Sequence, residues 1–231
     1  MTAKTERTGD GVILYDDALL DHADPGLFEP PATADAAPSV IGGRGAAWML
    51  KHGKDEWVLR HYRRGGLPGR FVRDRYLWIG LDVSRPWWEW HLLDSLYKEG
   101  LPVPQAVAAR VQRRGLLYKG DLITRRIPAA HNLAERLAAG GDIPWNAVGR
   151  CLRRFHEAGV CHADLNANNI LLDRAGQVYL IDFDRGTRRR EGAWRGANLA
   201  RLKRSLEKLS DEDAFNVKAW SALLEGYGRL Q

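Results

Sequence analysis

Apolar positions along the chain follow two different periods, one typical of strands and one typical of helices. Alternation or short apolar runs predict strands at 11–15, 39–41, 46–50, 57–62, 105–112 and 115–126. Helical spacing predicts helices at 86–98, 131–139 and 144–157, and an amphipathic helix bearing Leu199, Leu202, Leu206 and Leu209. Ser210 and Asp213 match a capping box, which predicts one more helix after them. The sequence therefore predicts an α+β fold in which most strands precede most helices.

The same pattern divides the chain into three parts. Residues 1–37 are expected to form an N-terminal extension, ending in a connector rich in Pro, Ala and Asp. Residues 38–126 contain most of the predicted strands and one helix, and residues 127–231 contain most of the helices. Arg126-Ile127-Pro128 lies at the expected boundary between the second and third parts.

Chemistry-bearing residues concentrate in one block, His162 to Asn169, followed by Ile-Asp-Phe-Asp at 181–184. The apolar runs on either side of Ala175-Gly176 predict a β-hairpin that brings Asn169 close to Asp182. Asp164 lies five positions before Asn169. Phosphoryl transfer needs this grouping: a carboxylate that orients a hydroxyl, and two oxygen ligands for Mg²⁺. Asp and Asn also cap turns without any chemistry, but three matches at this spacing favour the catalytic interpretation.

This block resembles the catalytic loop and the Asp-Phe-Gly segment of the protein-kinase-like phosphotransferases, with Asp184 in place of the Gly. The resemblance implies a bilobal protein-kinase-like fold, with an antiparallel sheet and one helix in the N-lobe and a small helical C-lobe. It implies that ATP and Mg²⁺ are required, that Asp164 is catalytic, and that Asn169 and Asp182 ligate the metal. Asp184 would add a metal contact or cap a turn, and we favour the cap. The short chain after Asp184 favours a small hydroxylated acceptor over a protein.

Upstream positions match the nucleotide-binding parts of the same fold. The glycine-rich turn Gly42, Gly43, Arg44 and Gly45 lies between predicted strands, where a backbone without Cβ atoms can approach phosphates closely. Arg60 occupies the place of the usual lysine, with Lys51 or Lys54 as substitutes if the strand register differs. Glu89 is the expected partner of Arg60. The alternatives are an exposed strand cation for Arg60 and a solvated helix-start carboxylate for Glu89.

Positive charge indicates an anionic partner. The net charge is +6 and the isoelectric point is about 9.5. Arginines crowd residues 60–75 and 185–195, and arginine binds phosphate and carboxylate through two parallel hydrogen bonds. Arg188, Arg189 and Arg190 are therefore candidates for binding the substrate. Arginine bias also arises from a GC-rich genome, and a charge run is often only a solvated loop.

Four segments narrow the resemblance: Arg60 to Gly66, Glu89 to Leu93, His162 to Leu172, and Asn198 to Ser205. Together they resemble the 3-deoxy-D-manno-octulosonic acid (Kdo) kinases, relatives of the lipopolysaccharide core heptose kinases, over about residues 38 to 210. The resemblance implies ATP-dependent phosphorylation of a Kdo hydroxyl on a lipid A precursor, at the cytoplasmic face of a bacterial inner membrane. Such an acceptor carries a carboxylate and phosphates, which agrees with the positive charge.

Three other functions fit parts of the sequence. A core heptose kinase or another small-molecule kinase would use the same catalytic residues. A nucleic-acid-binding module would use the arginine clusters, but no known motif of that kind is present, so we expect no nucleic-acid partner. A catalytically dead scaffold would leave the intact set of Asp164, Asn169 and Asp182 unexplained.

Location is predicted from what the sequence lacks. It has no apolar run approaching about 18 residues and no signal-peptide pattern, so we expect a cytoplasmic protein that docks peripherally on the membrane. The two cysteines, Cys151 and Cys161, suit a reducing compartment. Together with His156 and His162 they match no common zinc spacing, and we expect His156 and Cys161 to pack beside the catalytic loop.

Overall fold

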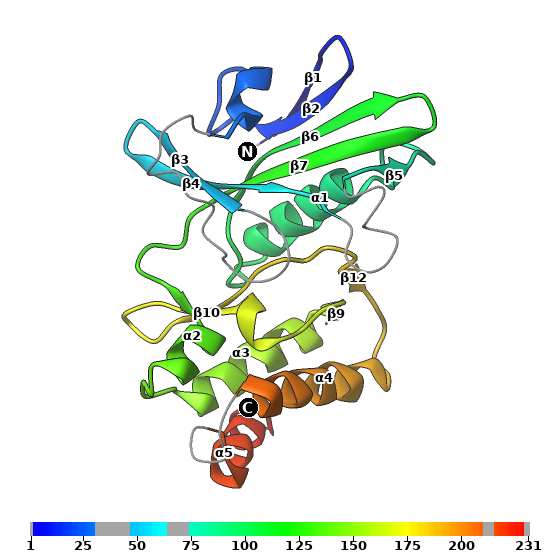
Figure 1. The fold of residues 1–231 in the computed structure, drawn as a ribbon. Helices are drawn as coiled ribbons and strands as arrows, with labels where there is room; N and C mark the ends of the chain where they lie inside the picture. The colour runs from blue at the N-terminus through cyan, green and yellow to red at the C-terminus, as the bar shows by residue number, and fades with distance from the viewer. Residues whose placement is uncertain (1, 31–46, 64–73, 210–214, 229–231) are drawn as a thin grey trace. The chain divides into compact units, whose positions relative to one another are not determined.

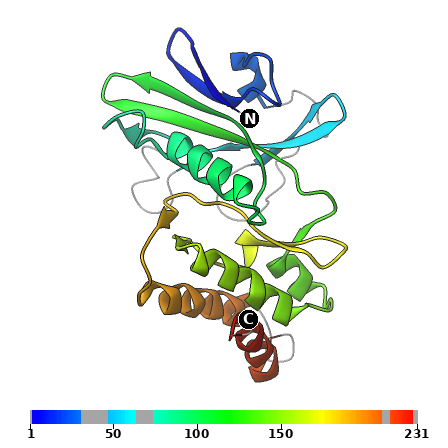
Figure 2. The same cartoon turned by 180° about the vertical axis from the view of Figure 1, so that it is seen from behind.

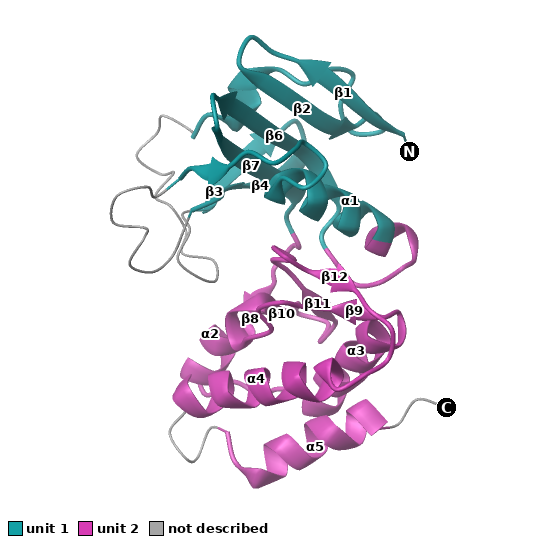
Figure 3. Ribbon diagram, turned by 90° about the vertical axis from the view of Figure 1, so that its right-hand side faces the viewer, with its two compact units in different colours: residues 1–95, 104–126 teal, residues 96–103, 127–231 magenta. Residues whose placement is uncertain are grey.

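The computed structural model describes residues 2–30, 47–63, 74–209 and 215–228, which form two compact units (Figures 1 and 2). Unit 1 comprises residues 1–95 and 104–126, and unit 2 comprises residues 96–103 and 127–231 (Figure 3). The chain thus enters unit 2 briefly at the end of the first helix before it returns to the sheet. No helix in the described ranges combines the length and apolar character needed to cross a membrane.

Unit 1 is built on an antiparallel sheet with the strand order β1-β2-β6-β7-β4-β3, and β5 pairs with β7 (Figure 1). The strands are β1 (Ala3–Arg7), β2 (Gly11–Asp16), β3 (Ala47–His52), β4 (Asp55–His61), β5 (Tyr76–Leu77), β6 (Ala106–Arg114) and β7 (Leu117–Arg125). The helix α1 (Arg85–Lys98) lies along this sheet. Gly120 permits the close approach, since a Cβ there would lie 2.5 Å from Cγ of Pro86.

The N-terminal residues differ from the sequence expectation. The prediction of an extension over 1–37 is wrong for residues 3–28, because β2 pairs with β6 and β1 pairs with β2. Buried apolar side chains of β2 and of the segment after it stabilise this pairing. Ile13, Tyr15 and Phe28 are buried in the same core as Trp57 and Ile123 of the central strands. Residues 31–37 and the predicted strand at 39–41 lie outside the described residues.

Unit 2 is mainly helical. Its helices are α2 (Leu133–Ala138), α3 (Trp145–Glu157), α4 (Trp194–Leu209) and α5 (Val217–Gly228). Short strands form two small sheets: β8 (His131–Asn132), β10 (Ile170–Leu172) and β11 (Val178–Leu180) form one, and β9 (Val160–Cys161) and β12 (Thr187–Arg188) form the other. α3 and α5 pack through Gly149 and Gly226, where an added Cβ would lie 2.0 to 2.1 Å from a carbonyl oxygen of the other helix.

The helix predicted at 131–139 begins two residues later than expected. His131 and Asn132 pair with β10 as β8, so their backbone groups are engaged in a sheet. Asn132 then caps α2 by accepting from the backbone N–H of Glu135, whose side chain accepts from the backbone of Asn132. The capping box predicted at Ser210 and Asp213 lies outside the described residues.

Candidate active site

The β10–β11 hairpin of unit 2 sets the geometry of the catalytic block. Ile170 pairs with Leu180, and the backbone N–H of Ile181 donates to the carbonyl of Asn169 at 3.1 Å. The predicted hairpin is therefore confirmed. Asn169 ends a 3₁₀ turn (Ala167–Asn169) just before β10, and Asp182 lies just beyond β11. The two proposed metal ligands thus come from the same end of one hairpin.

His162 connects this hairpin to the loop that carries Asp164. Its Nε2 lies 2.9 Å from the carbonyl oxygen of Ile181, and its Nδ1 accepts from the backbone N–H of Asp164 at 3.2 Å. These contacts require a proton on Nε2 and a lone pair on Nδ1, which is one neutral tautomer. Burial of the imidazole lowers its pKa, and so favours this uncharged form. The neutral imidazole of His162 therefore links the backbone at Asp164 to the backbone at Ile181.

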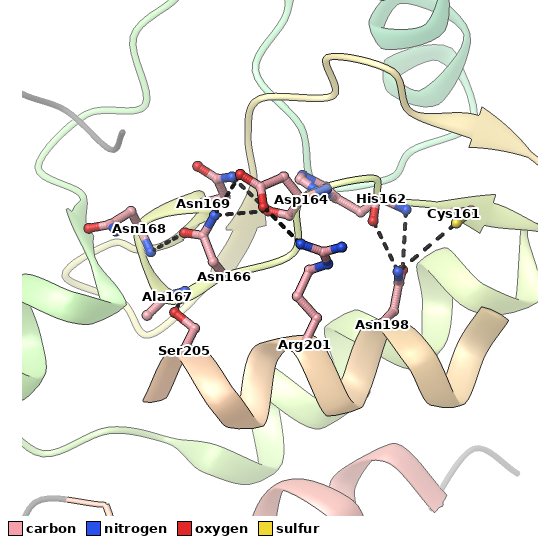
Figure 4. Close-up of polar contacts among 10 residues, drawn as sticks. All are labelled: Cys161, His162, Asp164, Asn166, Ala167, Asn168, Asn169, Asn198, Arg201 and Ser205. Carbon is pink, nitrogen blue, oxygen red and sulfur yellow. Dashed lines mark hydrogen bonds and ion pairs between the residues drawn. The ribbon is translucent and has the colours of Figure 1, made fainter. Parts of the chain in front are cut away.

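Asp164 is held by its backbone while its carboxylate remains accessible (Figure 4). The side-chain amides of Asn166 and Asn169 both donate to the Asp164 carbonyl at 2.9 Å. The carboxylate is 65% exposed, with Asn166 Nδ2 at 3.2 Å and Arg201 Nη1 at 3.5 Å from its two oxygens. An exposed carboxylate on an anchored loop suits a group that meets an incoming hydroxyl.

The donor set next to Asp164 fits a magnesium ion. Asn169 is 2% exposed, and its amide nitrogen is committed to the Asp164 carbonyl, which leaves the oxygen of the same amide as the possible ligand. Asp182 is half-buried and adopts a left-handed backbone conformation, with φ of 62°. Asp tolerates this region better than most residues, and such conformations cluster at functional sites. One amide and one carboxylate oxygen are hard ligands of the type that Mg²⁺ prefers.

Phe183 anchors the segment that contains Asp182 and Asp184. Its side chain is fully buried, with its ring 4.8 Å from the ring of His162 and 5.7 Å from that of Phe155 in α3. This burial fixes the backbone between two half-buried aspartates. Phe183 is thus part of the core, and it fixes Asp182 beside the hairpin.

One face of α4 holds the catalytic loop (Figure 4). Asn198 accepts from the backbone N–H of His162 at 3.2 Å and donates to its carbonyl at 3.0 Å. Ser205 accepts from the backbone N–H of Ala167 at 3.2 Å, and Arg201 between them reaches Asp164. The three α4 residues are spaced i, i+3 and i+7, which places them on one side of a helix. This explains physically the polar residues in the Asn198 to Ser205 segment.

The nucleotide candidates of unit 1 form a compact charged centre. Arg60 in β4 lies 2.5 Å from Glu89 in α1, so the expected partnership is present. Tyr62 donates its hydroxyl to the same oxygen of Glu89, which is 1% exposed. Lys51 and Lys54, the possible substitutes, are exposed at the end of the β3–β4 hairpin. Gly42, Gly43, Arg44 and Gly45 lie outside the described residues.

The second arginine cluster is partly committed to structure. Arg188 pairs with Glu99, donates to the carbonyl of Ala158 at 3.0 Å, and belongs to β12. Arg189 donates to the hydroxyl of Thr187 at 3.1 Å, and Arg190 is exposed. At least one of the three candidate substrate ligands therefore also has a structural role.

Sequence reasoning assigned no role to several residues that build this site. Tyr62, His162, Asn198, Arg201 and Ser205 all contact a candidate residue or its loop. The helical spacing of polar residues on an otherwise amphipathic α4 was an available signal. Tyr62 and His162 lie in segments that carry the family resemblance, but their contacts were not predicted, because these depend on which distant group folds against them.

Comparison with known proteins decides the family. The model described as "Lipopolysaccharide kinase (Kdo/WaaP) family" matches residues 38–227. The chain belongs to this family. The 3-deoxy-D-manno-octulosonic acid kinase of Stenotrophomonas maltophilia (strain K279a) is 46% identical over 215 residues, which cover 92% of this chain and 86% of the relative. The protein of the same name from Xanthomonas campestris pv. campestris (strain B100) is 47% identical over 212 residues, 90% of this chain and 85% of the relative.

Family membership confirms the predicted enzyme class, because the chain belongs to a family of lipopolysaccharide kinases. The described residues have the predicted α+β architecture, with an antiparallel sheet and one α-helix in unit 1 and a mainly helical unit 2. A solved structure of the bifunctional kinase-methyltransferase WbdD also matches, with 18% identity and a TM-score of 0.47. That match covers 88% of this chain and 46% of the WbdD chain.

Proposed function

We propose that this member of the Kdo/WaaP family transfers the γ-phosphoryl group of ATP to a hydroxyl of Kdo on a lipid A precursor. Relatives that are 46% and 47% identical over most of their length are named for kinase activity on this sugar acid. The observation that carries the proposal is the accessible carboxylate of Asp164, held beside the oxygen ligands of the β10–β11 hairpin.

Asp164 orients the sugar hydroxyl and accepts its proton late in the transfer. The hydroxyl oxygen forms a bond to the γ-phosphorus, while the bond from that phosphorus to the oxygen it shares with the β-phosphate breaks. The products are ADP and the phosphorylated sugar. When bound, Mg²⁺ neutralises charge on the phosphates, and Asn169 and Asp182 are the residues that would hold it.

Arg60 offsets negative charge on the nucleotide phosphates. Its guanidinium is prepared for this, because Glu89 and Tyr62 restrict the side chain before any nucleotide arrives. Gly42, Gly43, Arg44 and Gly45 would cover the phosphates with backbone N–H groups. Together these residues form the proposed ATP site.

The acceptor is an anionic lipid, so we place the protein at the cytoplasmic face of the bacterial inner membrane as a peripheral protein. Arg188, Arg189 and Arg190 are the proposed ligands of the acceptor's carboxylate and phosphates. Arg190 is the most available of the three, since the side chains of Arg188 and Arg189 also donate within the protein. No nucleic-acid partner is part of this proposal.

The test is direct phosphorylation in vitro. The purified protein is incubated with ATP, Mg²⁺ and detergent-dispersed Kdo-lipid A, and the lipid is weighed by mass spectrometry. We expect a product heavier by one phosphate group, absent when Mg²⁺ is chelated or when Asp164 is replaced by Ala. If Kdo-lipid A stayed unmodified while a heptose-containing core was phosphorylated, Kdo would be rejected as the acceptor. The assignment as a kinase would stand.

A further inference from the structure

Exposed apolar side chains gather at one end of the unit 1 sheet. Leu77 of β5 is 58% exposed, Ile79 is 73% exposed, and Leu116 in the β6–β7 turn is 75% exposed. These segments adjoin, because β5 pairs with β7 immediately after that turn and the backbone N–H of Trp78 donates to the carbonyl of Leu116 (Figures 1 and 2). Side chains of this size rarely cluster on a surface that contacts only water.

Cations surround these apolar residues. Arg114 pairs with Leu117 in the β6–β7 register, and Leu117 pairs with Leu77 of β5, so the three side chains share one face of the sheet. Lys119 lies two positions along β7 from Leu117, on the same face, and Arg75 directly precedes β5. A concave pocket of about 110 Å³ is lined by Arg75, Gln112, Arg114, Leu117, Tyr118 and Lys119.

The rest of this end of the sheet is rigid. The guanidinium of Arg113 lies 5.1 Å from the ring centre of Trp78 and donates to the carbonyl of Gly115 at 3.0 Å. Trp78 packs against Tyr118, with ring centres 6.0 Å apart. Asp74 pairs with Lys119 and also lies near Arg75, so the pocket keeps a net positive charge from Arg75, Arg114 and Lys119. The exposed leucines and isoleucine thus project from a fixed support.

We propose that this surface, the sheet-tip patch of Arg75, Leu77, Ile79, Arg114 and Leu116, docks the protein on an anionic lipid bilayer. Proteins that bind membrane surfaces reversibly combine a few inserting apolar side chains with cations that attract acidic headgroups. Trp78, which directly follows Leu77, is half-buried, and tryptophan is common at membrane interfaces. The proposal rests on the lipid-linked acceptor of the proposed function, and it assigns membrane docking to unit 1 rather than to Arg188, Arg189 and Arg190 of unit 2.

Several exposed apolar side chains and two pocket cations occur together in the sheet-tip patch. Val217, at the start of α5 in unit 2, is 82% exposed, but it adds one apolar side chain beside one exposed cation, Lys218. In the cluster around Arg188, Arg189 and Arg190, Arg188 is committed to Glu99. A lipid surface needs both attractions, and the sheet-tip patch supplies both.

Vesicle sedimentation tests the assignment with the full chain. Wild type is mixed with phosphatidylcholine vesicles, with or without phosphatidylglycerol, and the bound fraction is measured at low and high salt. We expect salt-sensitive binding to the anionic vesicles only. The variant L77S/I79S/L116S should lower the partition coefficient by about tenfold or more, since three inserting side chains are lost. R75Q/R114Q should lower it several-fold and reduce its salt dependence.

Matched controls remove the same chemistry from unit 2. V217S deletes an even more exposed apolar side chain, and R150Q/K218Q deletes two exposed cations, so both should bind vesicles as wild type does. Circular dichroism and transfer to detergent-dispersed Kdo-lipid A show that each variant is folded. Detergent removes the need for a bilayer, so sheet-tip variants should retain their turnover there.

Three results would overturn the assignment: unchanged binding of both sheet-tip variants, an equal loss in the controls, or a loss confined to R188Q/R189Q/R190Q. Binding of wild type to neutral vesicles as strongly as to anionic ones would also reject it, because apolar contact without charge attraction would then account for the binding. The proposed function fails separately, by absence of transfer to detergent-dispersed acceptor while vesicle binding is intact.

Discussion

The central carboxylates of the two units have opposite environments, one buried and one exposed. Glu89 of unit 1 is 1% exposed and receives both Arg60 and Tyr62, whereas the carboxylate of Asp164 in unit 2 is 65% exposed and its cation, Arg201, is 3.5 Å away. A buried carboxylate with two donors is a fixed support, and it is costly to remove. An exposed carboxylate on a restrained loop is available to another molecule. The comparison separates groups that position from groups that react.

Replacing the reactive carboxylate should have the largest effect on catalysis. Asp164→Ala should lower turnover by about 10²- to 10⁴-fold, the range typical of losing a general base. Stability should change little, because the exposed carboxylate makes few contacts. Steady-state kinetics and chemical denaturation measure the two quantities.

Asp182→Ala is the matched control for this variant. Its affinity for ATP should fall when Mg²⁺ is present, whereas Asp164→Ala should bind ATP within about threefold of wild type, as expected for a group that contacts the acceptor. Near-normal turnover of Asp164→Ala would remove it from the role of base.

Replacing the buried carboxylate should have its largest effect on folding. Glu89→Ala should lower the free energy of unfolding by about 3 kcal/mol, because Arg60 loses its buried partner, and the 23% exposure of the arginine side chain keeps the loss at the low end. Denaturant unfolding measures it. Glu89→Gln keeps an acceptor for Tyr62 and should lose less.

Arg60 distinguishes support from function within the same pair. Arg60→Ala should lower turnover tenfold or more, and Arg60→Lys should restore part of it because a lysine can serve the same phosphates. If Arg60→Ala reduced stability but left turnover and ATP affinity unchanged, the pair would be structural alone.

Sequence patterns predicted the parts of both centres that depend on local spacing. The hairpin that joins Asn169 to Asp182 follows from two apolar runs around a turn, and Arg60 and Glu89 were paired through the family resemblance. Tyr62 was missed because its contact with Glu89 depends on how α1 packs against β4. The strand at 11–15 was predicted, but its pairing with β6 was not, because pairing depends on a segment distant in the sequence. β1 was missed because an exposed strand at a sheet edge has few apolar positions to mark it.

Acid should destabilise unit 2 through its buried histidines. Burial of His156, above all other causes, lowers its pKa to about 4, from an ordinary value near 6.5. Between these two pKa values the unfolded chain binds a proton at His156, whereas the folded chain keeps this side chain neutral. The stabilisation is complete above pH 6.5 and is lost as pH falls towards 4, up to about 3 kcal/mol.

The variant His156→Gln isolates this contribution from the titration of carboxylates. The difference in unfolding free energy between wild type and variant should narrow by about 2 to 3 kcal/mol from pH 7 to pH 4. The hydrogen bond to Tyr227 is accessible to glutamine as well, so the pH dependence is the informative quantity. A constant difference across this range would contradict a neutral buried His156.

The smallest effects should come from the helix that supports the reactive loop, and they should differ along its face. Asn198 is 6% exposed and satisfies both the N–H and the carbonyl of His162. Asn198→Ala should therefore cost about 1 to 3 kcal/mol of unfolding free energy, the penalty for leaving buried backbone groups without partners. Arg201→Ala, which removes a half-exposed ion pair, should cost less than about 1 kcal/mol.

For turnover the order should be reversed, so that Arg201 matters more than Asn198. Loss of Arg201 leaves the loop folded and changes only the surroundings of Asp164, so turnover on Kdo-lipid A should change by no more than about tenfold. Arg201→Lys, which keeps the charge, should recover most of it. A fall in turnover as large as that of Asp164→Ala, without loss of stability, would make Arg201 a catalytic residue and place a second reactive group in the exposed centre of unit 2.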